Sequence, residues 1–243
     1  MTTRRIAMWS GPRNLSTAMM RAFENRTDCE VVDEPLYAHY LAATGAEHPG
    51  REAVVAAGDT DWQRVVKQLV GAAPNGQPLW YQKHMCHHLL PGMDTGWIGQ
   101  LENVLLIRDP AEVVASYLRT RDTCSAEEIG VPQQLALFEQ LKTGPTGPPP
   151  VIDAGCFLAD PRGQLQALCA LLGIAFSERM LSWPAGPRDS DGIWAPHWYQ
   201  QVWASTGFAA PRREPLELDA AGRRIVDACR PAYETLYAHR LRH

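Results

Sequence analysis

The hydrophobic pattern alternates between short apolar runs and longer segments with an apolar residue at every third or fourth position. The short runs have the length of β-strands, and the longer segments are typical of amphipathic helices. The run at 103–107 is apolar after its first residue, as expected for a parallel strand buried on both faces. We therefore predict an α/β fold with three layers, in which helices cover both faces of a parallel sheet. The predicted strands span 4–9, 29–33, 79–83, 103–107 and 151–154.

Capping residues mark the ends of several predicted helices. Asp61 is a side-chain cap ahead of apolar residues at helical spacing. Pro110 and Pro161 each follow an aspartate and take the first helical position, where proline is favoured, and Gly173 suits a helix end. A Gly/Pro-rich stretch at 143–150 predicts a surface loop. Helices are thus predicted at 16–26, after Asp61, after Pro110, at 132–142, from Pro161 to Leu172, and at about 219–240 with a kink at Pro231.

The chain of 243 residues suits one domain with a sizeable core, and we predict a single domain over residues 1–243. The region at about 183–212 differs from the rest, because it holds four of the eight tryptophans among Pro and Gly residues. Two interpretations stay open for this region. It is either a loop that large rings pack onto the sheet, or a lid that forms a wall of an acceptor pocket.

Charge and cysteine content limit the partners and the compartment that we expect for this protein. The formal net charge of -4 leaves no excess of basic residues, which argues against a nucleic-acid or anionic-membrane binder. The six cysteines are scattered with no C-x-x-C pair, as expected for reduced thiols. No segment approaches the length of a membrane span. We expect a cytoplasmic protein with a small-molecule partner and no nucleic-acid or membrane partner, and a homodimer stays open.

The first chemical motif is the segment from Ser10 to Thr17, SGPRNLST, which joins the first predicted strand to the first predicted helix. Such a junction binds anions, because the first-turn N–H groups lack a helical acceptor and the helix dipole is positive there. Arg13 adds a charge that can hold an oxyanion through two hydrogen bonds. The lysine and the second glycine of a Walker A sequence are absent. The alternative is an ordinary strand–turn–helix with Ser16 as its N-cap.

The second motif is Arg108-Asp109-Pro110 with Ser116 eight residues after the arginine. Arg108 follows a buried strand, at the edge where open α/β sheets bind ligands. Ser116 lies about two turns into the next predicted helix. Arginine and hydroxyl together suit a phosphate monoester. The alternative is an Arg–Asp surface pair and a solvent-facing serine.

Together, the two motifs resemble those of the sulfotransferase superfamily, whose members transfer a sulfuryl group from 3′-phosphoadenosine-5′-phosphosulfate (PAPS). The first loop of that family reads P-[KR]-[ST]-G-[ST]-[ST]. Its second signature is Arg-[DN]-Pro at a strand end with a serine eight residues after the arginine. The resemblance implies a P-loop fold with PAPS as the donor and no metal. The donor site that it implies consists of Gly11, Pro12, Arg13, Asn14, Leu15, Ser16 and Thr17 at the phosphosulfate, and of Arg108 and Ser116 at the 3′-phosphate.

The resemblance spans roughly residues 4–175 and has two departures. Leu15 stands where the family usually has glycine, so the backbone there must avoid a positive φ or carry a steric cost. The late Arg-Lys-Gly segment of cytosolic members has no clear counterpart. Arg188 or the pair at 212–213 are candidates to replace it at the 3′-phosphate.

Transfer by in-line displacement needs a base for the acceptor and positive charge at the leaving oxygen. Arg13 suits the second task. Glu34, after the second strand, is the preferred base, because carbohydrate-type sulfotransferases resemble this chain in using a glutamate near there. His84 is the next candidate, one position away from the Lys-x-His histidine of cytosolic members, and Lys83 adds charge near the transferred group. His87 and His88 are further alternatives for the base.

The sequence therefore predicts a PAPS-dependent sulfotransferase acting on a hydroxyl or amine of a small molecule. A P-loop kinase or nucleotide hydrolase is the alternative, although the Lys-[ST] pair is missing and no obvious magnesium aspartate lies on a hydrophobic strand. A non-catalytic nucleotide-binding module is the third interpretation, because a fold does not fix a function.

Overall fold

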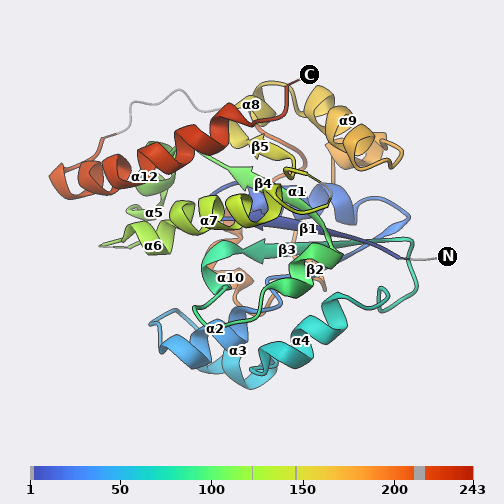
Figure 1. The fold of residues 1–243 in the computed structure, drawn as a ribbon, viewed down its shortest axis with the longest axis horizontal. Helices are drawn as coiled ribbons and strands as arrows, with labels where there is room; N and C mark the ends of the chain where they lie inside the picture. The colour runs from blue at the N-terminus through green and yellow to red at the C-terminus, as the bar shows by residue number, and fades with distance from the viewer. Residues whose placement is uncertain (1–2, 122, 146, 211–216, 243) are drawn as a thin grey trace.

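A computed structural model describes residues 3–121, 123–145, 147–210 and 217–242. Within these residues the centre is a five-stranded sheet with the strand order β2-β3-β1-β4-β5. Every pair of neighbouring strands is parallel, so all strands end at the same edge of the sheet (Figure 1). The strands are β1 (Arg4–Ser10), β2 (Cys29–Asp33), β3 (Leu79–Met85), β4 (Glu102–Ile107) and β5 (Val151–Asp153).

Helices cover both faces of this sheet, and the predicted three-layer α/β fold is confirmed. Alternate residues of β1 point to opposite faces: Ala7 and Trp9 join one apolar cluster, and Ile6 and Met8 join the other. The first cluster includes α4 (Trp62–Leu69), α5 (Pro110–Tyr117), α7 (Val131–Lys142) and α12 (Ala220–Ala238). The second includes α1 (Ser16–Glu24), α8 (Ala154–Ala159), α9 (Pro161–Leu171) and the 3-10 turn η3 (Glu178–Leu181).

A third apolar cluster lies beyond the carboxyl end of β2. It joins α2 (Tyr37–Thr44) and α3 (Arg51–Ala57) to α10 (Ala195–Trp198) and the residue that follows it, Tyr199. The sequence pattern did not predict these short helices. The remaining elements are α6 (Ala126–Ile129), α11 (Gln200–Trp203), η1 (Cys86–His88) and η2 (Gly96–Gln100).

The predicted caps are present. Asp61 accepts the N–H of Gln63 at 3.0 Å, Asp109 accepts that of Ala111 at 2.8 Å, and Asp160 accepts that of Gly163 at 3.0 Å. Gly173 takes a left-handed φ of 61° after α9. α12 contains Pro231 and continues as a helix on both sides of it. The strand predicted at 151–154 ends one residue earlier, because Asp153 caps α8 through the N–H of Cys156.

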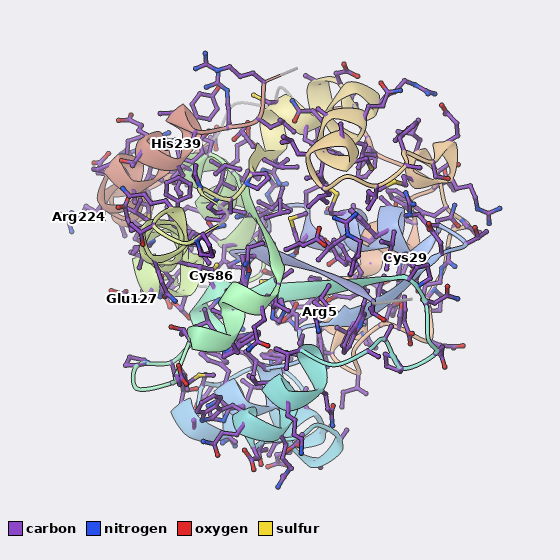
Figure 2. All side chains as sticks on the ribbon, turned by 45° about the vertical axis from the view of Figure 1, so that its right-hand side comes forward. Arg5, Cys29, Cys86, Glu127, Arg224 and His239 are labelled. Carbon is purple, nitrogen blue, oxygen red and sulfur yellow. The ribbon has the colours of Figure 1, made fainter. Side chains whose placement is uncertain are left out.

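The chain leaves β1 and β4, which are neighbours, toward opposite faces of the sheet. α1 follows β1 on the face of the second cluster, and α5 follows β4 on the face of the first. Such a divergence opens a crevice at the carboxyl ends of the strands, where α/β proteins bind ligands. Figure 2 marks this edge by Cys86, which follows β3, and the opposite edge by Cys29, where β2 begins. No helix in the described ranges is long and apolar enough to cross a bilayer.

Candidate active site

The residues that follow four of the strands surround one cavity of about 250 Å³ at the carboxyl edge of the sheet. The loop after β1 forms one wall, and Glu34 follows β2. Lys83 lies near the end of β3, and Arg108 follows β4. Predicted site residues that line the cavity are Pro12, Arg13, Asn14, Leu15, Ser16, Thr17, Glu34, Lys83, Arg108 and Ser116. Two motifs that lie about a hundred residues apart in the sequence therefore share one cavity.

The loop between β1 and α1 is held open by an unusual backbone. Arg13 has a φ of 61° and Leu15 a φ of 70°, both in the left-handed region that non-glycine residues rarely adopt. Leu15 thus takes the conformation that a glycine would adopt more easily. It is also the N-cap of α1, without a side-chain cap, so Ser16 is not the N-cap of the alternative interpretation. The first-turn N–H groups of α1, which have no intrahelical acceptor, open onto the cavity.

Two hydrogen bonds fix this loop to β4 and to the residue after it. Asn14 Nδ2 donates to the carbonyl of Leu106 at 3.2 Å, and Arg108 Nη1 donates to the carbonyl of Arg13 at 3.0 Å. Arg108 Nε also pairs with Glu112 at 2.6 Å. Arg108, a residue of the second motif, therefore helps to hold the backbone of the first motif in place.

Gly11 does not line the cavity but is needed for close packing of the loop. A Cβ at this position would lie 2.2 Å from the carbonyl oxygen of Ile129 at the end of α6. We expect Gly11→Ala to lower the free energy of unfolding by about 1–3 kcal/mol, because the loop and α6 must move apart. Urea unfolding measures the change. The control is Gly99→Ala, where an added Cβ meets nothing within 4 Å, and equal stabilities of both variants would contradict the expectation.

Arg13 supplies positive charge at the mouth of the loop. Its Nη2 donates to Thr120 Oγ1 at 2.8 Å, and its guanidinium lies 5.5 Å from the ring centre of Trp198. Burial lowers the pKa of Arg13, and the positive charges of Arg121 and Arg119 lower it further. Within the described chain, no carboxylate forms an ion pair with Arg13. A bound anion would relieve this repulsion.

Lys83 belongs to a buried polar network instead of presenting a free charge. Its Nζ donates to Asp33 at 2.8 Å, to Glu34 at 2.6 Å and to the hydroxyl of Tyr199 at 2.6 Å. Tyr199 in turn donates to Asp33 at 2.8 Å and receives the indole N–H of Trp194 at 3.2 Å. Burial alone would lower the pKa of Lys83, but the two carboxylates outweigh it and raise that pKa well above the ordinary value. Lys83 therefore orients Glu34.

Glu34 is the acid that this network presents to the cavity. Its backbone is also left-handed, with a φ of 43°, and its side chain is 10% exposed. Desolvation raises the pKa of Glu34, and the charge of Lys83 opposes the rise. Lys83 contacts Oε1, whereas Oε2 lies 4.0 Å from Nε2 of His88. A carboxylate with a raised pKa and one uncommitted oxygen is suited to accept a proton.

The structure does not bring His84 to the cavity, which corrects its place among the candidate bases. Its ring stacks on Trp9 at 4.2 Å, and its Nε2 contacts Gln82 at 3.2 Å. Burial lowers the pKa of His84 to about 3. Side chains alternate along β3, so His84 and the cavity-lining Lys83 point to opposite sides. His87 and His88 line the cavity instead.

The cavity also has a wall of rings, of which the sequence pattern did not single out the part that comes from α2. α2 supplies Tyr37 and Tyr40, and the Trp-rich region supplies Trp194, Trp198 and Tyr199. Residues of that region thus line the cavity, whereas its Trp183 packs into the second apolar cluster. The spacing of Tyr37 and Tyr40, which places both rings on one side of a helix, was the sequence signal that could have predicted the part of the wall that α2 supplies. Of the further candidates for the 3′-phosphate, Arg188 does not line the cavity, and Arg212 and Arg213 lie outside the described residues.

The cavity offers positive charge and ring surfaces to a ligand rather than a set of metal ligands. Among the residues that the structure describes, no group of three or more His, Cys, Asp or Glu side chains is arranged to hold a metal ion. The arginines, the helix N-terminus and the loop suit an anion.

Comparison with known proteins identifies the family and the fold of this chain. The model of the Sulfotransferase domain family matches residues 4–240, and the chain belongs to that family. The sulfotransferase of Alicyclobacillus acidocaldarius superposes with a TM-score of 0.58 at 13% identity, over 100% of this chain and 98% of that one. The sulfotransferase domain of the curacin biosynthetic pathway superposes with a TM-score of 0.52 at 14% identity, over 93% of this chain and 97% of the other. At such identities the likeness shows a shared fold.

Two curated relatives carry a different name. The branched-chain-amino-acid aminotransferase-like proteins 2 and 1 of Arabidopsis thaliana are 34% and 36% identical over 234 residues. The match covers 96% of this chain but only 41% and 42% of those proteins. The chain thus spans about two fifths of the length of the curated relatives that it matches.

Proposed function

We propose that this protein is an enzyme that transfers a sulfuryl group from PAPS to a hydroxyl group of a small acceptor. The observation that carries the proposal is the shared cavity of the loop before α1 and the Arg108–Ser116 pair. PAPS has two separate phosphate ends. The loop with Arg13 suits the phosphosulfate, and Arg108 with Ser116 suits the 3′-phosphate.

In the proposed reaction the acceptor oxygen attacks sulfur in line with the bond to the 5′-phosphate. The new S–O bond forms as the old one breaks, and the electron pair leaves with 3′-phosphoadenosine-5′-phosphate. The acceptor proton passes to the carboxylate of Glu34, whose raised pKa matches that task. Arg13 and the N–H groups of α1 stabilise the charge that develops on the leaving oxygen.

The name of the curated relatives suggests transfer of an amino group as another chemistry. Pyridoxal-phosphate enzymes form a covalent bond to their cofactor through a lysine amine. Lys83 is the only lysine among the described residues that line the cavity, and its two carboxylate partners keep it protonated. Sulfuryl transfer is the better fit to these residues.

Thermal stabilisation by nucleotides tests the proposal. We expect 3′,5′-ADP to raise the melting temperature strongly, and 5′-AMP and magnesium-ATP to raise it little, because only 3′,5′-ADP engages both anion sites. Stabilisation by magnesium-ATP alone would instead favour a kinase or nucleotide hydrolase. Binding of 3′,5′-ADP without sulfation of any acceptor would favour a binding module.

The variant Ser116→Ala tests the proposed 3′-phosphate site specifically. We expect it to weaken 3′,5′-ADP binding about tenfold, the loss of one hydrogen bond to a charged group, with little effect on 5′-AMP. Arg108→Ala should weaken 3′,5′-ADP more, but it also frees the Arg13 carbonyl, so some loss for 5′-AMP is expected. The control is Arg224→Ala, an exposed residue of α12 labelled in Figure 2. Calorimetric titration measures the affinities, and equal losses for both nucleotides in Ser116→Ala would contradict the assignment.

A further inference from the structure

One side of the cavity consists of flat rings. The ring of His88 stacks against two tyrosines, 5.0 Å from Tyr37 at an interplanar angle of 10° and 4.8 Å from Tyr40 at 28°, and the two tyrosine rings lie 6.4 Å from each other. His87 packs edge-on against Tyr40 at 5.2 Å. Tyr37 also hydrogen-bonds to His48. Burial keeps the three histidines neutral by lowering their pKa values, that of His87 to about 3 and that of His48 to about 4. This ring wall (Tyr37, Tyr40, His48, His87 and His88) suits an uncharged planar group.

A second observation lies beside the ring wall. The guanidinium of Arg121 sits 5.4 Å from the ring centre of Trp198 and 5.6 Å from that of Tyr117. Its Nη2 is buried and has no hydrogen-bond partner, and its Nη1 reaches only the carbonyl of Glu47 at 3.5 Å. A buried, unpartnered N–H on a charged group is destabilising. Arg121 also lines the cavity, so a ligand bound there can provide the missing partner.

The acidic side chains that line the cavity interact with residues other than Arg121. Glu34 pairs with Lys83 at 2.6 Å, and Glu128 accepts the N–H of Ser125 at 2.8 Å as part of a capping box. In the described ranges no carboxylate forms an ion pair with Arg121. The donor site proposed above also leaves it unused, since that site consists of the loop with Arg13 and of Arg108 with Ser116.

We propose that the acceptor is a hydroxylated aromatic acid. Its ring packs on the ring wall, its carboxylate forms a charge-assisted pair with Arg121, and its hydroxyl reaches Glu34. The inference rests on the proposed sulfotransferase function and names the substrate class of the same site. The acceptor must be small, because the cavity of about 250 Å³ also receives both phosphate ends of the donor.

Matched pairs of acceptors test this assignment. A series of hydroxybenzoates, hydroxyphenylacetates and hydroxyphenylpropanoates is compared with the corresponding primary amides, with PAPS as the donor. We expect kcat/KM for the best acid to exceed that for its amide by about tenfold or more, because the charged hydrogen bonds are lost in the amide. Arg121→Gln should reduce this preference to about threefold or less.

The control is Arg119→Gln, two residues away, exposed, and absent from the cavity wall. It should keep the preference for the acid. Calorimetric titration of the acids into protein saturated with 3′,5′-ADP provides a readout that does not depend on turnover. Arg121→Gln should weaken acid binding about tenfold. Its effect on the affinity for 3′,5′-ADP should be similar to that of Arg119→Gln, because the charges of both arginines act on Arg13.

The outcomes separate this inference from the proposed function. Absence of 3′,5′-ADP binding would overturn the proposed function itself. Binding of 3′,5′-ADP with no preference for acids, or with no acid of the series bound, would overturn the aromatic-acid assignment alone. An Arg121→Gln variant with a raised KM for PAPS and an intact acid preference would place Arg121 in the donor site and likewise overturn it.

Discussion

Replacing Glu34 with glutamine should lower the turnover of sulfuryl transfer about 10²–10⁴-fold, the usual contribution of a general base. Glutamine preserves the shape of the side chain and its contact with Lys83, but it cannot take up the acceptor proton. Steady-state kinetics with saturating PAPS measures the loss. Binding of 3′,5′-ADP should persist, because Glu34 does not belong to the two anion sites.

The wild-type pH profile gives a second readout of the same role. Desolvation raises the pKa of Glu34 above 4.5 in the folded enzyme, so kcat/KM should fall as the pH drops through that raised value. The control is Glu127→Gln, an exposed acid of α6 labelled in Figure 2, which should retain full turnover. Unchanged turnover in Glu34→Gln would move the base to His87 or His88, which line the cavity, and not to His84.

Lys83→Met should be the most destabilising of the substitutions considered. It leaves the carboxylates of Asp33 and Glu34 buried beside each other without their cation. Breaking a buried ion pair in this way costs about 3–5 kcal/mol of unfolding free energy. Urea unfolding at pH 8 measures the change, and Lys67→Met on the exposed side of α4 is the matched control.

This loss should depend on pH. Without Lys83 the charge that most lowers the pKa of Glu34 is gone, so its folded-state pKa rises further above that of the unfolded chain. A carboxyl group with a raised folded-state pKa stabilises the fold at low pH, and this contribution is lost as the pH rises through the folded-state pKa. The deficit of Lys83→Met should therefore be smaller at pH 5 than at pH 8. A deficit that is equal at both values would contradict the buried network.

Local sequence signals were sufficient to predict the sheet and the residues that follow its strands. Strand runs, caps and the proline at position 110 act within a few residues, and the parallel topology then brings every strand end to one edge. The loop after β1 and Arg108 were predicted as one site from their joint resemblance to the sulfotransferase superfamily, and this topology explains why they meet. Leu15 shows the limit of local propensity, since the surrounding fold imposes a left-handed φ of 70° on it.

The aromatic wall of the cavity and the buried network around Lys83 depend on contacts between segments that are distant in the sequence. Tyr199 reaches Asp33 across 166 positions, and Trp198 lies beneath both Arg13 and Arg121. The periodicity of hydrophobic residues along the sequence does not predict such contacts. His84 was placed among the candidate bases because the predicted strand ends at Lys83, whereas β3 continues to Met85 and its alternation turns His84 away from the cavity.

The left-handed backbones of Arg13, Leu15 and Glu34 have a consequence for binding. Each such conformation costs on the order of 1–3 kcal/mol and persists only where the surroundings dictate it. Since the net stability of a domain is only about 5–15 kcal/mol, the rim of the cavity takes up a substantial share of what the core provides. In return the rim is shaped before any ligand arrives. Ligands then meet a preorganised surface, and association loses little affinity to the ordering of the loop.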